Sequence, residues 1–387
     1  MNRLSYFFFS LLLTLSAFRA TAGDEIRSGE LWPDDKGQHI NAHGGGILQY
    51  KGHYYWFGED KDSQTNNALV GVSCYRSDDL IKWTKLPTAL SVDTTDAESP
   101  IARGCILERP KVIYNARTRR FVMWFHLELK GRGYAAAYAG VATAKKPEGP
   151  YKFIRASRVN AQQLPADMNE GDIQRMRLLD ESDYTKWWTP EWRKAIAEGL
   201  FLRRDLEKGQ MARDMTLYVD TDGRAYHIYS SEDNLTLQIA ELSDDYCSHT
   251  GRYIRVAPAG QNEAPCLLKH NGRYWLITSG CTGWAPNAAR LFSAPSIMGP
   301  WTENLGNPCT GADNANITFG GQGTYVIPIT SKGGATRFIF MADIWRPNCP
   351  SDGRYLWLPI HFRQDGQPEI PWRETWSMEK FLSGAYD

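Results

Sequence analysis

Short apolar segments rich in aromatic residues recur along the chain, and turn residues bound each of them. Five such segments are residues 52–57, 120–125, 222–229, 271–277 and 337–341. Two of them open on Asp-Gly or Asn-Gly, the strongest short-range signal for a β-hairpin. The pattern predicts five hairpin-centred units in an all-β chain. A repeat of this kind fits a five-bladed β-propeller, in which each blade is a small antiparallel sheet.

One long polar segment, residues 158–209, interrupts this pattern. Inside it, residues 190–199 predict a helix, because Thr189 can cap it, Pro190 fits its first turn and Gly199 can end it. We therefore expect a helical insertion between blades two and three, and long insertions in compact domains are often functional. We expect residues 23–387 to form a single propeller domain that includes this insertion.

The first 22 residues read as a signal peptide. A positive residue precedes the apolar run 6–17, and the small residues 20–22 stand before Gly23. The run is short for a membrane span, so an uncleaved anchor is the weaker alternative. We expect the mature chain to begin near Gly23, in the periplasm or outside the cell.

Composition narrows the choice of partner. The chain has 44 Lys plus Arg and 44 Asp plus Glu, which gives no electrostatic reason to bind nucleic acid or an anionic membrane. Its 14 Trp indicate a strand-rich core, and some of them could instead form platforms that stack on sugar rings. The seven Cys show no zinc-binding spacing and are interpreted as buried free thiols.

Three acidic residues stand beside the predicted inner strands of successive units. They are Glu108, Asp214 and Glu263, in blades two, three and four. Such positions converge on the axis of a propeller, so the carboxyl groups can share one pocket. Glycoside hydrolysis needs that arrangement, with one carboxyl group kept protonated by burial and neighbouring charge. Any one of the three alone would fit a salt bridge, but their recurrence favours a shared site.

Two motifs carry a resemblance to a known family. Asp214 precedes an Asp-Thr-Asp-Gly hairpin at residues 220–223, and Glu263 opens the sequence Glu-Ala-Pro. With these motifs the chain resembles glycoside hydrolase family 43 over roughly residues 37–375. The resemblance implies a five-bladed propeller and an inverting mechanism.

Blade one departs from the usual pattern of that family. Where most members carry an Asp base, this chain has Ala-His-Gly-Gly-Gly at residues 42–46. Together with residues 108–111 and 281–287, this is similar to the branch of exo-β-1,3-galactanases and arabinogalactan-trimming enzymes. In that branch a blade-five Gln faces the water, and Gln322 matches it, with Gly on both sides where the branch usually has Ser.

The resemblance implies roles for individual residues. Glu263 is the expected proton donor, Asp214 raises its pKa and orients it, and Gln322 and Glu108 position the attacking water. The expected hydrogen-bonding partners of the terminal sugar are His43, Glu59, Arg109, Glu232 and Thr282, and the expected stacking platforms are Trp284 and Trp124. Structural alternatives are a core amide for Gln322, a loop histidine for His43, blade-to-blade ion pairs for Glu59 and Glu232, and a core indole for Trp124.

We therefore expect an exo-acting glycosidase that releases galactose from β-1,3-galactan or arabinogalactan. An α-L-arabinofuranosidase or a β-D-galactofuranosidase on the same fold is the alternative within this class, and a non-catalytic carbohydrate-binding propeller is the alternative outside it. The expected partner is an oligo- or polysaccharide, with no nucleic acid, no membrane once the signal is removed, and a monomeric protein. No residue set requires a cofactor or metal, although backbone and water oxygens on the axis could hold a structural cation.

Overall fold

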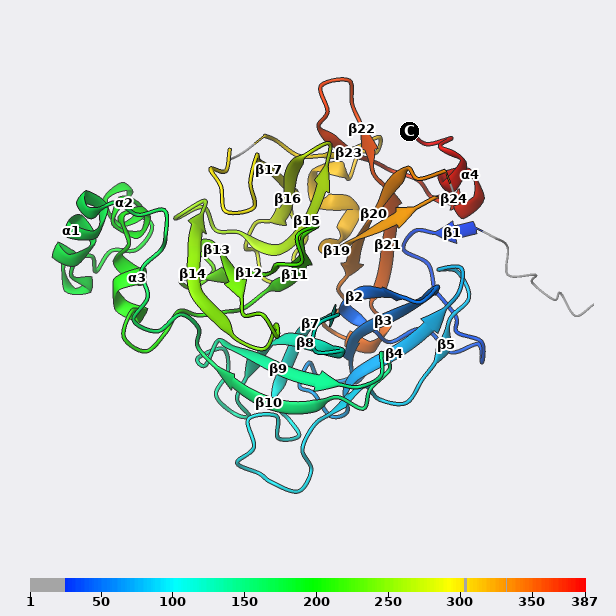
Figure 1. Ribbon diagram of the computed structural model, residues 1–387, viewed down its shortest axis with the longest axis horizontal. Coiled ribbons are helices and arrows are strands. Elements are labelled where there is room, and N and C mark those ends of the chain that lie inside the picture. Colours follow the sequence, from blue (N-terminus) through cyan, green and yellow to red (C-terminus); the bar gives the residue numbers. More distant parts are fainter. Residues whose placement is uncertain (1–24, 303–304, 332) are drawn as a thin grey trace, which may run out of the picture.

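The computed structural model describes residues 25–302, 305–331 and 333–387. The predicted signal peptide lies outside the described residues. Five antiparallel sheets stand around a common centre, as Figure 1 shows. The prediction of an all-β, five-bladed propeller is therefore confirmed.

The first three blades have four principal strands each. Blade one contains β2 (His43–Tyr50), β3 (His53–Asp60), β4 (Gly71–Ser77) and β5 (Thr84–Lys85), with β6 (Leu90–Ser91) also paired to β4. Blade two contains β7 (Ile106–Asn115), β8 (Arg120–Glu128), β9 (Tyr138–Ala144) and β10 (Lys152–Ser157). Blade three contains β11 (Met215–Val219), β12 (Ala225–Ser231), β13 (Thr236–Leu242) and β14 (His249–Val256).

The other two blades have three principal strands each. Blade four contains β15 (Glu263–His270), β16 (Arg273–Ser279) and β17 (Arg290–Ala294), and blade five contains β19 (Gln322–Thr330), β20 (Thr336–Ile344) and β21 (Arg354–Pro359). Beside blade five, β1 (Glu25–Arg27) pairs with β24 (Thr375–Ser377), and β18 (Cys309–Thr310), β22 (His361–Phe362) and β23 (Pro368–Pro371) form a small sheet. Helix α4 (Met378–Ser383) follows β24.

The first strand of each blade is the innermost one. Strand β2 contacts β7, β7 contacts β11, β11 contacts β15, β15 contacts β19, and β19 returns to β2. The aromatic segments found in the sequence are the second strands, β3, β8, β12, β16 and β20. Because the ring closes, residues at the same end of the five inner strands face one another across the axis.

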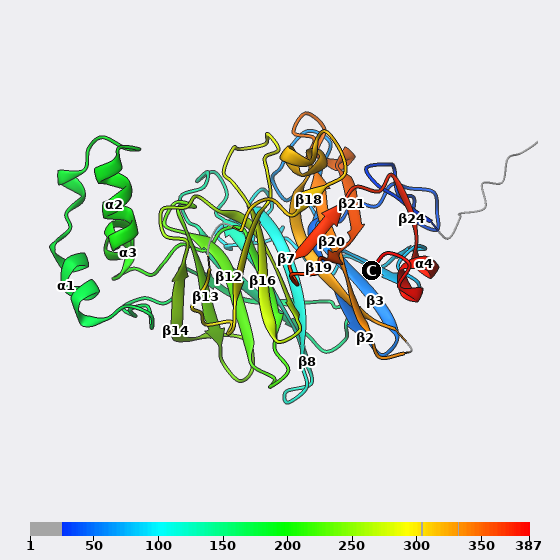
Figure 2. The same cartoon turned by 90° about the horizontal axis from the view of Figure 1, so that it is seen from above.

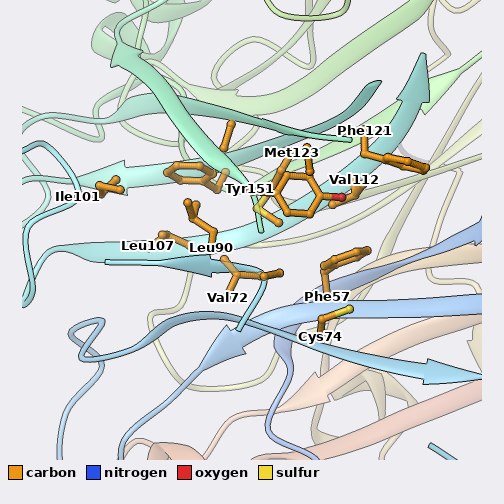
Figure 3. Close-up of a cluster of buried hydrophobic side chains, with 14 of the residues drawn as sticks. Phe57, Val72, Cys74, Leu90, Ile101, Leu107, Val112, Phe121, Met123 and Tyr151 are labelled. Carbon is orange, nitrogen blue, oxygen red and sulfur yellow. The ribbon is translucent and has the colours of Figure 1, made fainter. Parts of the chain in front are cut away.

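Apolar side chains fill the space between neighbouring blades. Figure 3 shows the cluster between blades one and two, where Phe57 and Cys74 of blade one face Met123 of blade two. All three are at most 1% exposed. Burying a side chain as large as Phe57 contributes about 1.5–3 kcal/mol. Packing of this density leaves the inner strands little freedom and so fixes the groups that they carry.

The insertion forms three α-helices, α1 (Glu170–Leu178), α2 (Pro190–Glu198) and α3 (Leu200–Asp205), with the short 3-10 helix η1 (Glu181–Asp183) between α1 and α2. As predicted, Thr189 caps α2 by accepting the Trp192 N–H at 3.2 Å, and Gly199 ends the helix in the left-handed conformation at φ 108°. Figure 2 shows the helices standing beside blade three. Trp192 packs in a cluster with Leu235, which joins the insertion to the turn after β12. This confirms the predicted helical insertion between blades two and three.

Two further findings concern the cysteines and membrane contact. All seven cysteines are free thiols, and Cys74, Cys105, Cys266 and Cys309 are buried. Among the described residues, no helix has both the length and the apolar character needed to cross a membrane.

Candidate active site

A β-bulge recurs near the start of the inner strands. The register shifts just after His43 in β2, Glu108 in β7 and Glu263 in β15, and again after Gly323 in β19. The residue that follows each of the first three is left-handed: Gly44 at φ 59°, Arg109 at φ 55° and Ala264 at φ 54°. A bulge re-aims neighbouring side chains. This shared device directs groups from separate blades toward one end of the axis.

A pocket of about 230 Å³ opens at that end of the ring. Of the residues predicted from the sequence, it is lined by Glu59, Glu108, Arg109, Asp214, Glu263, Trp284 and Gln322. These residues come from all five blades. The three acidic motifs therefore do converge on one cavity, as their positions predicted.

Glu263 is the protonated acid of the pocket. Burial and the nearby Asp214 carboxylate raise its pKa to about 7, although the positive charge of Arg109 opposes the shift. Its Oε1 accepts a hydrogen bond from Asn234 Nδ2 at 2.7 Å, and its Oε2 accepts one from Gln322 Nε2 at 3.4 Å. A carboxyl group with a pKa near neutrality can donate a proton and be reprotonated in each cycle.

Arg109 connects the acid pair to blade five. Its Nη2 lies 2.8 Å from Asp214 Oδ2 and donates to Gln322 Oε1 at 2.6 Å, while its Nη1 donates to the Gly323 carbonyl at 2.9 Å. Asp214 also accepts the Ala264 N–H at 3.1 Å, directly after Glu263. One buried guanidinium thus forms an ion pair with Asp214 and fixes the amide of Gln322.

The amide of Gln322 is held on both sides. Its Oε1 accepts from Arg109 and, at 2.8 Å, from Trp345 Nε1, so both carbonyl lone pairs are occupied. Its Nε2 donates to Ser279 Oγ at 3.0 Å and makes the longer contact to Glu263. The contact to Glu263 is the one most readily exchanged for a water, with Nε2 donating to the water oxygen.

Glu108 is the ionised carboxylate of the pocket. It lies 3.0 Å from His126 Nδ1 and accepts from the Tyr134 hydroxyl at 2.8 Å, and hydrogen bonding and charge from His126 lower its pKa to about 2 despite burial. His126 Nε2 lies 2.9 Å from the buried Glu128, which also accepts two backbone N–H groups, from Ala136 and Ala137. The two carboxylates outweigh burial and raise the pKa of His126 to about 9.

Protonated His126 should therefore stabilise the fold over a defined pH range. Its pKa rises from 6.5 to about 9 on folding, so its contribution is complete below pH 6.5 and is lost as the pH rises through 9. Between pH 6 and 9.5, the Tm advantage of the wild type over His126→Asn should shrink steadily. Thermal unfolding of both proteins across this range checks it, and a constant difference would show that His126 stays neutral.

Glu59 forms a second buried ion pair at the pocket. Its Oε2 lies 2.6 Å from Lys61 Nζ, and its Oε1 accepts the Arg109 N–H at 3.0 Å. A Cβ atom at position 44 would lie 2.2 Å from Glu59 Oε1, which explains the glycine there. Glu59 thus lines the pocket, as expected, and its ion-pair partner Lys61 follows the same strand, so the pair does not join two blades.

Aromatic residues form the outer wall. Trp284 is 42% exposed and packs edge-to-face on Trp345, with ring centroids 5.9 Å apart. Thr282 does not line the pocket. Its hydroxyl donates to the Ala285 carbonyl at 2.6 Å and accepts from Asn287, so it shapes the turn that presents Trp284.

Besides Thr282, three more predicted sugar contacts lie away from the pocket, which corrects the expectation for each. His43 is fully buried and stacks on Tyr355, with centroids 5.4 Å apart. Trp124 is 2% exposed and donates to the Tyr246 carbonyl in the core between blades two and three. Glu232 is fully buried and pairs with Arg255 at 2.7 Å. The structural alternative, a core indole, describes Trp124. His43 instead lies in strand β2, and neither of its ring nitrogens has a hydrogen-bond partner among the described residues. The partner of Glu232, Arg255, belongs to the same blade, so that ion pair does not join two blades.

Several pocket residues were not identified from the sequence. They are Lys61, His126, Tyr134, Arg213, Asn234 and Trp345. His126 is the strand partner of Glu108, and Trp345 directly follows β20. Their position along the strands could have identified some of these residues, because the second strands end at the same face of the propeller at which the inner strands begin.

Glu108, His126 and Asp214 place one possible ligand atom each within 4.8 Å of one another. A protonated imidazole cannot coordinate a metal, and both nitrogens of His126 already face carboxylates. Asp214 is paired with Arg109. Each carboxylate of the group already has a cationic partner, His126 for Glu108 and Arg109 for Asp214, so the group fits an ion-pair network better than a metal centre.

Comparison with known proteins places this geometry in a family. A profile described as "Glycosyl hydrolases family 43" matches residues 181–368. A solved family 43 β-1,3-galactosidase with galactodeoxynojirimycin is 54% identical, and the alignment covers 91% of this chain and all of that one, with a TM-score of 0.87. The chain belongs to glycoside hydrolase family 43.

Two further relatives extend the comparison. An exo-β-1,3-galactanase from Clostridium thermocellum is 34% identical, with a TM-score of 0.72 over 91% of this chain and 66% of that one. A β-D-galactofuranosidase from Aspergillus niger is 24% identical over 65% of this chain. The alignment spans 64% of the length of that curated relative. The family 43 chain described here therefore has structural neighbours that act on β-1,3-linked galactose.

Proposed function

We propose that the protein is an exo-acting, inverting glycoside hydrolase that releases terminal galactose from β-1,3-galactan or from the β-1,3-linked parts of arabinogalactan. The observation that carries this proposal is a pocket in which the pKa of Glu263 is raised to about 7 and that of Glu108 is lowered to about 2, with Asp214 held in an ion pair with Arg109. A protein that only binds sugar has no need of such a tuned pair. The names of the solved relatives support galactose as the sugar released.

In this mechanism one half of the pocket, Glu263 with Asp214, acts on the leaving group, and the other half, Gln322 with Glu108, acts on the attacking water. Glu263 gives its proton to the glycosidic oxygen as the bond to the sugar breaks. A water attacks from the other face, with its oxygen held by Gln322 Nε2 and its protons directed to Glu108. Because the Gln322 carbonyl is already occupied by Arg109 and Trp345, Glu108 is the stronger hydrogen-bond acceptor for that water.

The shape of the pocket supports attack at a chain end. It is a cavity of about 230 Å³ at one mouth of the ring, and Arg109, which is 4% exposed, lies on its inner side. Trp284 and Tyr134 stand at its rim, 42% and 44% exposed. A terminal sugar can enter while the next unit meets these aromatic groups, whose flat faces suit the apolar side of a sugar ring.

The testing experiment uses purified wild-type protein on β-1,3-galactan and on nitrophenyl β-galactopyranoside, α-arabinofuranoside and β-galactofuranoside. We expect galactose as the sole small product from galactan, first appearing as the α-anomer in proton NMR, because inversion of a β-linkage gives that anomer. Release from a furanoside alone would move the assignment to the alternative that the Aspergillus relative favours. Saturable galactan binding without release would show a binding module instead.

We further propose that the enzyme acts outside the cytoplasm. The basis is the amino-terminal sequence, with its apolar run and small residues before Gly23. Fractionation of cells that express the full chain, with amino-terminal sequencing of the mature protein, tests the location and the cleavage point together.

A further inference from the structure

A buried lysine lies directly beneath the pocket, and no step proposed above uses it. Lys111 is 1% exposed and extends from the inner strand β7. Its Nζ donates to the Gly44 carbonyl at 2.8 Å and to the Arg109 carbonyl at 3.3 Å. The amino group therefore links the backbones of blades one and two at their left-handed bulge residues.

The surroundings of Lys111 place it close to the axis. A Cβ atom at Gly46 of β2 would lie 2.6 Å from Lys111 Cδ and 3.4 Å from a ring carbon of Tyr325 in β19. Within the described residues, neither of its hydrogen-bond acceptors is a carboxylate. A buried ammonium held by backbone carbonyls alone occupies the type of site that a structural cation would take.

We propose that Lys111 is a positioning residue. Its buried amino group takes the place of a structural cation near the axis, and its hydrogen bond holds the Arg109 backbone in the conformation that the reaction needs. Arg109 depends on that conformation, because its side chain must reach Asp214 and Gln322 together. Without the lysine, the Gly44 and Arg109 carbonyls would be buried without this donor, and the bulge could relax. Both halves of the catalytic pocket would then shift at once.

The ionisation of Lys111 is compatible with this role. Burial and, secondarily, the charge of Arg109 lower its pKa to about 7. The pKa of Glu263 is also about 7, so Lys111 carries its charge over the same acidic range in which Glu263 is protonated. Above that range the neutral amine still has N–H donors for the two carbonyls.

The test compares Lys111→Met with the wild type on β-1,3-galactan. It relies on the proposed hydrolase activity, so wild-type turnover is measured first, and its absence would count against that activity and not against Lys111. We expect kcat to fall about 10²-fold, as for other displacements of about 1 Å in a catalytic site, with KM changed much less. In the pH profile of kcat/KM, the alkaline limb should move to higher pH, because a displaced Arg109 no longer lowers the pKa of Glu263.

Two controls separate positioning from general stability. Lys269→Met removes a lysine from the inner strand β15 that pairs with Asp220 at 2.8 Å, and it should lower Tm without changing kcat or the pH limb. Lys111→Arg keeps a charge and N–H donors and should retain kcat within about tenfold of the wild type; this comparison still stands if Lys111→Met does not fold. A folded Lys111→Met enzyme with the kcat and the alkaline limb of the wild type would overturn the proposal. So would a loss of activity in Lys111→Met that is fully explained by the smaller fraction of folded protein, or a Lys111→Arg enzyme that is folded but inactive.

Discussion

Replacement of Glu263 by Gln should lower kcat on β-1,3-galactan by about 10²- to 10⁴-fold, the range that a general acid contributes. The amide keeps the size of the side chain but has no proton to give to the departing sugar oxygen. KM should change little, since Gln can still accept from Asn234. Glu241→Gln, on β13, the third strand of blade three, where the acid pairs with Arg252, is the matched control and should keep full activity.

The size of this loss should depend on the leaving group. A nitrophenolate leaves without protonation, so Glu263→Gln should lose far less activity on nitrophenyl β-galactopyranoside than on galactan. In the wild type, kcat/KM on galactan should fall as the pH rises above about 7, because Glu263 then loses its proton. The variant should lack that limb. Equal losses on both substrates would assign the acid role to another residue.

The same substitution should affect stability in the opposite direction. Folding raises the pKa of Glu263 from 4.5 to about 7, so ionisation destabilises the folded state progressively as the pH rises from 4.5 to 7. Gln cannot ionise and avoids that cost. The Tm of Glu263→Gln relative to the wild type should therefore increase across this range and then level off, a pattern expected where a functional group is kept at a cost in stability.

The sequence was sufficient to predict the fold and the acid positions because both depend on local signals. Hairpin turns marked the second strands, and Glu108, Asp214 and Glu263 stood at equivalent points of three repeats. Closure of the ring then brings equivalent points together. Helix α2 was predicted to the residue, because Thr189 and Gly199 act on backbone groups within one turn.

The errors concern the direction in which a side chain points. Trp124 and Glu232 lie on or next to strands, and period-two alternation alone does not tell a pocket-facing position from one between blades. His43 is equivalent in register to Glu108 and Glu263, yet it packs on Tyr355. Pocket residues such as Asn234 and Trp345 come from connections after second strands, where no periodic pattern exists to identify them.

Replacement of Gln322 by Ala should lower kcat by about 10²- to 10³-fold, a loss comparable to that of one fixed polar group at a reacting centre. The variant frees Arg109 and Trp345 from the carbonyl and removes the donor proposed to hold the water. Azide is a strong nucleophile that needs neither the Nε2 donor nor deprotonation, so added azide should restore turnover to Gln322→Ala and yield the α-glycosyl azide. It should not do so for Glu263→Gln on galactan, where the leaving group still needs a proton.

Gln322→Glu distinguishes holding the water from deprotonating it. One carboxylate oxygen could still accept from Arg109 and Trp345, but the other would face Glu263, to which the native amide donates. The added negative charge should raise the pKa of Glu263 and move the alkaline limb above pH 7. If the water requires only a base, this variant should be more active than Gln322→Ala. If it requires the Nε2 donor, both variants should be equally slow, and that is the result we expect, because Glu108 already provides the ionised acceptor.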